Sequence, residues 1–168
     1  MVGEDHLISE LLRSGHEATP AEVGRILSRM ATAPLDVRLV RVPGYLRGQP
    51  YGGRTLQRRD QSAFVHLVKR VRYDRQWAED TTMADYLEDL RRAVRQPDAH
   101  LLIYARHGEH HAGVIADTDL AVPVGRRGEL ALPNLLVVYS WERRAIRTGY
   151  QFSAMDKVGI PGDARWLK

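Results

Sequence analysis

The sequence contains no cysteine among its 168 residues. Disulfide bonds, thiolate catalysis and Cys-type zinc sites are therefore excluded. No apolar run approaches the roughly 18–20 residues that a membrane helix needs. The acidic start M-V-G-E-D-H-L lacks the basic and apolar segments of a secretory signal. These absences predict a cytoplasmic protein with no membrane partner.

Lysine is scarce as well. Lys69, Lys157 and Lys168 are the lysines of the sequence, and the other residues of the Lys and Arg total are arginine. A GC-rich genome accounts for this bias. Phosphate recognition accounts for it too, since the guanidinium fork matches phosphate geometry.

The charge is concentrated in one part of the chain. Residues 37–76 hold ten basic and two acidic residues, a net charge of +8, whereas residues 1–36 and 77–98 are each net −3. Such a stretch indicates an anionic partner, with nucleic acid first. The alternative is a solvated basic face that the acidic segments neutralise.

The N-terminal residues have the pattern of two amphipathic helices. Apolar side chains share a stripe over residues 4–14, and Gly15 ends that segment. A capping box at T-P-A-E, from Thr19 to Glu22, begins a second helix that runs to about Met30. We expect a helical hairpin over residues 1–34, followed by an α+β domain over residues 35–168.

Helices precede strands in this second part of the chain. After a strand at 37–42 and a loop rich in Gly and Pro, helices are expected from about 61 to 73 and from 82 to 95. The period then changes to that of strands, at 100–105, 111–117, 135–141 and 145–152. This predicts an antiparallel β-meander of four to five strands with helices packed on one face. The other face is free to form a concave site, and the C-terminal segment is expected to lie across the sheet.

The helix expected at 61–73, with Asp60 as its cap, has two distinct faces. Its buried face is apolar. At 100° per residue, four side chains fall together on the opposite face: His66, Lys69, Arg70 and Tyr73. These could form a solvated helix face or contact a substrate. If they pack against the rim of the sheet, the solvated interpretation fails for all of them.

The last expected strand reads A-I-R-T-G-Y-Q-F, from Ala145 to Phe152. Because side chains alternate, Ile146, Thr148 and Tyr150 should share one face and Arg147 should point to the other. The β-propensity of Thr and Tyr is a sufficient reason for their presence. A polar floor of a binding site is the alternative.

Metal-independent RNA cleavage needs side chains of the kinds found on these two segments. Histidine can accept the 2′-hydroxyl proton or protonate the leaving 5′-oxygen. Cations and hydrogen-bond donors stabilise the phosphorane, and aromatic rings hold a base. The candidate catalytic residues are His66, Lys69, Arg70, Thr148 and Tyr150, with no metal and no cofactor. The candidate RNA-binding residues are Arg47, Arg54, Arg58, Arg59, Arg72 and Arg147, with Tyr45 and Tyr51 for stacking.

The stretch H-G-E-H-H, from His107 to His111, suggests a metal site, a solvated hairpin tip, or a contribution to catalysis if the tip borders the site. Adjacent residues of a strand point to opposite faces. His110 and His111 are therefore poorly placed to ligate one ion.

The order of a basic helix with a histidine, a second helix with Y-L-x-x-L, and a meander ending in T-x-Y resembles the barnase, EndoU, colicin and RelE (BECR) group of small ribonucleases. The resemblance covers roughly residues 60–155. It implies an endoribonuclease, such as a toxin or phage-associated effector, with RNA as substrate and a neutralising protein as partner. It also implies His66 as acid or base, Lys69 or Arg70 at the phosphate, and Thr148 and Tyr150 at the substrate.

The chain departs from that group in two respects. The sequence identifies neither a second catalytic histidine nor the glutamate base of barnase-type members, and it is poor in lysine. Two other functions therefore stay open. One is a nucleic-acid-binding module without catalysis, and the other is a protein-interaction or assembly subunit.

Overall fold

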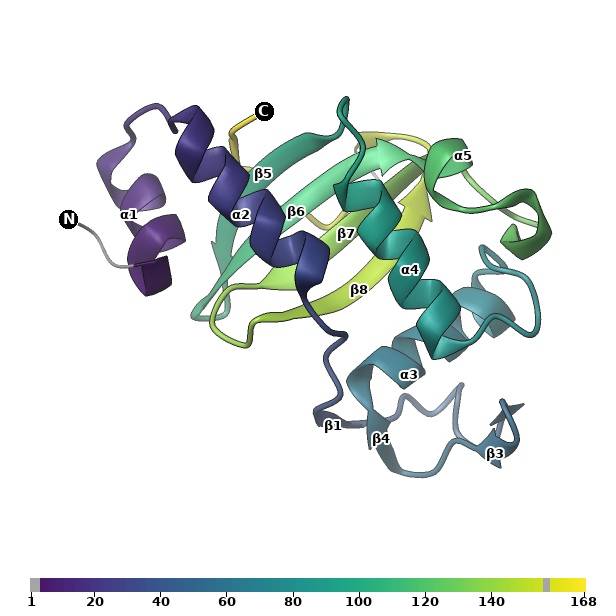
Figure 1. Ribbon diagram of the computed structural model, residues 1–168. Coiled ribbons are helices and arrows are strands. Elements are labelled where there is room, and N and C mark those ends of the chain that lie inside the picture. The colour runs from purple at the N-terminus through teal and green to yellow at the C-terminus, as the bar shows by residue number, and fades with distance from the viewer. Residues whose placement is uncertain (1–3, 156–157) are drawn as a thin grey trace.

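The computed structural model describes residues 4–155 and 158–168. It confirms the predicted α+β class: a five-stranded antiparallel sheet carries helices on one face, with a helical pair at the N-terminus (Figure 1). Within these residues, none of the helices combines the length and apolar character that crossing a bilayer requires.

The N-terminal pair consists of α1 (Leu7–Ser14), preceded by the short turn η1 (Glu4–His6), and α2 (Pro20–Thr32). The predicted capping box is confirmed, because the Thr19 hydroxyl accepts from the Glu22 N–H and the Glu22 side chain accepts from the Thr19 N–H. Apolar side chains of both helices, including Ile8 and Met30, belong to the same hydrophobic core as the helix-facing side of the sheet.

The sheet has the strand order β8-β7-β6-β5-β9, with every pair antiparallel. Its strands are β5 (His100–Arg106), β6 (Glu109–Asp117), β7 (Asn134–Ser140), β8 (Ala145–Phe152) and β9 (Arg165–Trp166). Short helices α5 (Thr118–Ala121) and η3 (Val124–Arg126) lie between β6 and β7. The predicted meander is confirmed, and the C-terminal segment adds the fifth strand beside β5.

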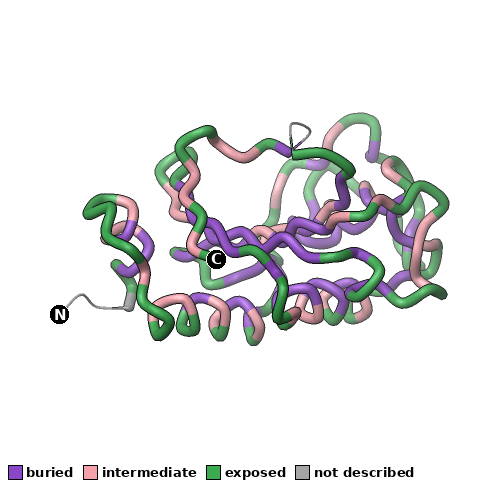
Figure 2. Tube along the Cα trace, turned by 90° about the horizontal axis from the view of Figure 1, so that it is seen from above, coloured by how far each residue is buried: buried purple, intermediate pink, exposed green. Residues whose placement is uncertain are grey.

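The two faces of the sheet are covered differently. The helix layer, with α2 and α4 (Met83–Val94), covers one face. On the other face, Tyr104, Leu136 and Phe152 pack with Val158 and other residues of the C-terminal segment. Figure 2 shows this segment arching over the sheet on the side away from the helices. The expectation that it lies across the sheet is confirmed, so this face is partly covered.

The basic stretch forms two small ribbons. Strand β1 (Leu39–Arg41) pairs with β4 (Arg59–Gln61), and β2 (Pro50–Tyr51) pairs with β3 (Arg54–Thr55). The loop expected here therefore contains a tight hairpin. Gly52 and Gly53 form its turn, where φ values of +61° and +82° favour glycine.

Asp60 does not cap the following helix, which corrects the prediction. Helix α3 (Ser62–Val68) begins after Gln61 without a side-chain cap. Asp60 lies inside β4 opposite Val40, where it is buried and accepts two hydrogen bonds from Arg54, at 2.7 and 2.8 Å. The helical region then continues as a π-helical turn, η2 (Lys69–Tyr73), in which the Asp74 N–H donates to the Lys69 carbonyl at 2.9 Å.

Strand β8 contains a β-bulge at Arg147. Tyr139 pairs with Ile146, but the adjacent Val138 pairs with Thr148, which leaves Arg147 as the extra residue. A bulge reverses the alternation of side chains along a strand. Ile146 therefore joins the helix-facing core, whereas Tyr150 joins the cluster on the far face. The prediction that both share one face is wrong, because simple alternation holds only in a strand without a bulge.

Side chains cover the outer edge of β8. The Tyr86 hydroxyl of α4 donates to the Gly149 carbonyl at 2.7 Å and accepts from the Gly149 N–H at 2.8 Å. Arg70 Nε donates to the same carbonyl at 2.9 Å. The Gln76 side chain accepts from the Gln151 N–H at 2.8 Å and donates to the Gln151 carbonyl at 2.9 Å. The outward backbone groups at these positions are thus satisfied, as an edge strand requires.

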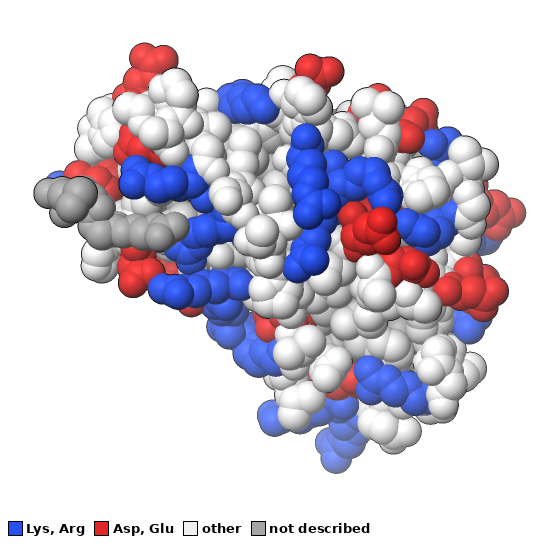
Figure 3. Space-filling view, in the orientation of Figure 1, with Lys and Arg blue, Asp and Glu red and all other residues white. Residues whose placement is uncertain are grey.

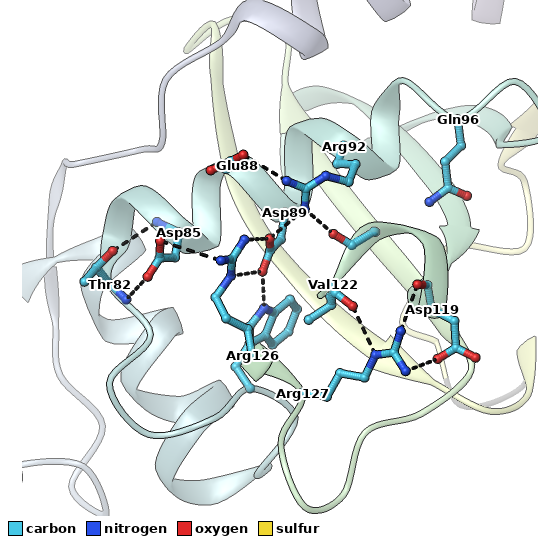
Figure 4. Close-up of polar contacts among 12 residues, drawn as sticks. Thr82, Asp85, Glu88, Asp89, Arg92, Gln96, Asp119, Val122, Arg126 and Arg127 are labelled. Atoms are coloured by element: carbon cyan, nitrogen blue, oxygen red, sulfur yellow. Dashed lines mark hydrogen bonds and ion pairs between the residues drawn. The ribbon is translucent and has the colours of Figure 1, made fainter. Parts of the chain in front are cut away.

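A buried carboxylate also fixes helix α4. The side chain of Asp89 is fully buried and accepts hydrogen bonds from Trp77 Nε1 at 3.1 Å, Arg126 Nε at 3.0 Å and an Arg92 guanidinium nitrogen at 3.0 Å (Figure 4). A buried charge is tolerated when it is paired in this way. The predicted capping box of Thr82 and Asp85 begins the same helix and is confirmed.

We expect Gly149→Ala to destabilise the protein by about 1–3 kcal/mol, since overpacking a filled core costs that amount. A Cβ at this position would lie 2.2 Å from Leu90 Cδ2, and Leu90 is fully buried. Urea unfolding midpoints measure the change. The matched control is Gly24→Ala in α2, where no atom lies within 4 Å of the added methyl group. This control should gain about 0.5–1 kcal/mol, and equal midpoints for the two variants would contradict the packing argument.

Candidate functional site

A cavity of about 300 Å³ lies against the far face of the sheet, next to β8. Five parts of the chain form its wall: α3, the β5–β6 hairpin, β7, β8 and the C-terminal segment. The lining residues are His66, Tyr104, Arg106, His107, Glu109, His111, Val138, Arg147, Thr148, Tyr150 and Gly159.

The structure brings four of the predicted site residues together in this cavity. His66 comes from α3, and Arg147, Thr148 and Tyr150 come from β8. The bulge matters here, because it lets Arg147 line the same cavity as Thr148 instead of pointing to the opposite face. Lys69 and Arg70 do not line the cavity.

Arg70 lies behind the wall of the cavity. Its exposed fraction is 5%, so the expectation of a solvated helix face is wrong for this residue. Its guanidinium donates to Thr148 Oγ1 at 3.1 Å and to Asp74 at 2.8 Å, and it lies 5.2 Å from the ring centroid of Tyr150. Of the predicted polar face, Arg70 packs against the edge of the sheet and there positions two cavity residues, whereas Tyr73 is exposed.

Glu109, at the start of β6, was not singled out by the sequence as a catalytic base. Its carboxylate accepts a very short hydrogen bond from Arg143. It also accepts a hydrogen bond from an Arg147 guanidinium nitrogen at 3.1 Å. His111 Nε2 lies 3.7 Å from it. Burial raises the pKa of Glu109, but the hydrogen bond and charge of Arg143 and the charge of Arg147 outweigh it, so the pKa is lowered. The carboxylate is therefore ionised at neutral pH.

His66 is uncharged at neutral pH. Burial, and then the positive charges of Arg70, Arg147 and Lys69, lower the pKa of its imidazole to about 3. A neutral imidazole can accept a proton, but it lacks the second ring proton that an imidazolium donates as a general acid. Of the two roles the resemblance implies, the unliganded cavity therefore favours that of base.

His111 is held flat against Tyr104, with ring centroids 5.1 Å apart and planes at 17°. Burial lowers the pKa of His111, although Glu109 opposes this shift. Its Nδ1 is buried and has no hydrogen-bond partner among the described residues. Burial also raises the pKa of Tyr104 to about 12, so its hydroxyl keeps its proton.

Arg147 joins two acidic side chains across the bulge. Besides Glu109, it approaches Asp36, whose Oδ2 lies 3.9 Å from Arg147 Nε. Both of these atoms are buried, and neither makes a hydrogen bond within the described chain. Arg147 therefore has hydrogen-bonding capacity beyond its contact with Glu109.

The stretch H-G-E-H-H borders this site. His107 and Gly108 form the hairpin turn, both with positive φ, and His107 is exposed at the rim. His110 points to the opposite face from His111 and contacts Glu142, as the alternation predicted. Among the described residues, no three His, Asp or Glu side chains are grouped so as to hold a metal ion.

The predicted RNA-binding arginines fall into two groups. Arg54 pairs with Asp60 and lies 3.6 Å from the ring centroid of Phe64, and Arg72 pairs with Glu79 at 3.0 Å. Arg47 donates to the Val42 carbonyl at 3.0 Å. These three make side-chain contacts within the protein, whereas the side chains of Arg58 and Arg59 make no hydrogen bond or ion pair with the residues that the structure describes. Tyr51 is not available for stacking, because it is buried and its hydroxyl donates to the Thr81 carbonyl at 2.5 Å.

No protein-family model matches the chain, and neither does any curated protein or solved structure.

We expect the neutral histidine to make stability depend on pH. In the unfolded chain a histidine titrates near 6.5, whereas the folded protein lowers the pKa of His66 to about 3. As the pH falls from 7 to 5, the unfolded chain binds the proton first and the free energy of unfolding decreases. One such group contributes at most about 1.4 kcal/mol per pH unit.

Urea unfolding at pH 7, 6 and 5 measures this dependence in the wild type and in His66→Gln. The variant should lose less stability over the interval. NMR should show no titration of the His66 imidazole above pH 5. Equal slopes in the two proteins, together with an imidazole that titrates near pH 6.5, would contradict the assignment.

Proposed function

We propose that this cavity is the active site of a metal-independent endoribonuclease. The observation that carries the proposal is that one cavity collects proton-transfer groups, a cation, hydroxyl donors and aromatic rings from separate parts of the chain. Each is a type of group that RNA cleavage through the 2′-hydroxyl requires.

Glu109 is the group that we assign to accept the 2′-hydroxyl proton, because it lines the cavity and its carboxylate is ionised. The 2′-oxygen then attacks the adjacent phosphorus and the bond to the 5′-oxygen breaks. His107, at the exposed rim, donates a proton to that 5′-oxygen. The products are a 2′,3′-cyclic phosphate and a 5′-hydroxyl end.

His66 is the second candidate for the base. A bound phosphate would offset the charges of Arg70 and Arg147 that lower its pKa, and so would bring that pKa closer to neutrality. Arg147 and Thr148 would donate to the non-bridging oxygens, and Tyr104 and Tyr150 would contact the base. Arg70 would act through Thr148 and Tyr150 as a positioning residue.

Nucleic-acid binding without cleavage is the second function that we consider. The charge of +8 in residues 37–76 favours it, since such a stretch attracts a polyanion whether or not the cavity is catalytic. An assembly role would need neither the cavity nor the basic stretch.

The test is cleavage of a total RNA and tRNA mixture in the presence of EDTA. We expect the wild type to leave 2′,3′-cyclic phosphate ends. Glu109→Gln should lower the rate by roughly 10²–10⁴-fold, the range typical of acid–base catalysis. His66→Gln, Tyr150→Phe and Arg70→Gln should each lower it by a smaller factor.

The matched control is Glu129→Gln, a substitution of a largely exposed glutamate that pairs with Arg75 outside the cavity. It should cleave at the wild-type rate. Urea midpoints show whether each variant is folded at the assay temperature. RNA that stays intact with the wild type, or cleavage that every variant retains, would overturn the enzymatic proposal.

A further inference from the structure

The outward face of the β1–β4 ribbon carries a cluster of three arginines. Arg41 and Arg59 lie directly opposite each other across the two strands, and Arg58 adjoins them. Together they line a surface hollow of about 410 Å³. In Figure 3, Lys and Arg side chains gather at the lower end of the molecule, over the region of this ribbon.

These arginines differ from nearly all the others in the chain. In the described residues, the arginine side chains that make neither a hydrogen bond nor an ion pair are Arg25, Arg41, Arg58 and Arg59. Arg25 lies apart from the rest, on α2. Like charges directly opposite each other on paired strands are destabilising. Charge repulsion within the cluster therefore destabilises the free protein, and a bound polyanion would relieve it.

The cluster lies next to the cavity along the chain. Strand β4 leads directly into α3, and His66 follows Gln61 by about one helical turn. Three extended residues and one turn of helix span roughly 16 Å. An RNA strand with one nucleotide in the cavity could therefore place its neighbouring phosphates at the arginines.

The size of the cavity favours single-stranded RNA over a duplex. Small-molecule sites occupy about 300–1,000 Å³, and this cavity, at about 300 Å³, is at the lower limit. It has room for one nucleotide rather than a base pair. Unstacked bases of that kind belong to single-stranded RNA.

We propose that Arg41, Arg58 and Arg59 form a phosphate-backbone site that holds single-stranded RNA outside the cavity. This inference rests on the proposed action on RNA, but it concerns a separate surface. Of the arginines predicted from the sequence, it keeps Arg58 and Arg59 and adds Arg41.

The test measures binding of a fluorescent 2′-O-methyl oligouridine of 12 nucleotides, which lacks the attacking hydroxyl, between 50 and 400 mM salt. The variant carries Arg41→Gln, Arg58→Gln and Arg59→Gln. Each phosphate contact of a single strand contributes about 0.7 to the slope of log K against log salt. Loss of three contacts should lower the slope by about 2, so the ratio of wild-type to variant affinity should fall about 60-fold between 50 and 400 mM salt.

A charge-matched control carries Arg13→Gln, Arg25→Gln and Arg144→Gln. These arginines are exposed, and two of them are paired, Arg13 with the half-buried Glu10 and Arg144 with the exposed Asp5. The control should keep the wild-type slope within 0.7, the contribution of one contact. The melting temperature of the cluster variant should equal or exceed that of the wild type, because the like charges are removed.

Several results would overturn the inference. One is a wild-type protein that does not bind the oligonucleotide, and another is a control whose slope falls as much as that of the cluster variant. Tighter binding to a duplex of the same length would overturn the single-strand assignment.

Cleavage of a dinucleotide separates this inference from the proposed function. A dinucleotide is too short to reach the cluster, so the cluster substitutions should slow its cleavage much less than they slow cleavage of a 12-nucleotide RNA. If the wild type cleaves no RNA while the slope still falls by about 2, the arginine site stands and the ribonuclease proposal fails.

Discussion

The contact between Gly149 and the side chains of Tyr86 and Arg70 joins the helices to the outer edge of the sheet, and the cavity depends on it. Because the residue has no side chain, α4 can approach β8 closely enough for Leu90 to pack on the strand. The backbone of Gly149 is hydrogen-bonded from outside by Tyr86 and Arg70. With the strand fixed in this way, Thr148 and Tyr150 on either side are aimed at the cavity.

The electrostatics of the cavity follow from the bulge in the same strand. The extra residue, Arg147, lies between Asp36 and Glu109. It helps to lower the pKa of Glu109 and that of His66. Arg147 thus adds to the larger effects of burial on His66 and of Arg143 on Glu109.

Local sequence signals predicted the elements well, and tertiary contacts explain what they missed. The capping boxes at Thr19 and Thr82, the meander and the bounds of β8 could be read from side-chain chemistry and periodicity. The bulge could not, because a two-residue period carries no mark of an extra residue. Arg70 looked solvent-exposed because its packing partner, β8, lies far away in the sequence. Glu109 was visible beside its histidines, but nothing local showed that the hairpin tip and α3 line one cavity.

The distances along the sequence between these partners have a kinetic consequence. Arg70 and Gly149 are 79 positions apart, and Gln76 and Gln151 are 75 apart. Contacts of such long range close late, after the entropy of large loops has been lost, and they slow folding to milliseconds or longer. The helices and the local hairpins can form before the two halves of the cavity meet. A partly folded chain would then contain every residue of the site and yet no site, so its chemistry would begin with the last step of folding.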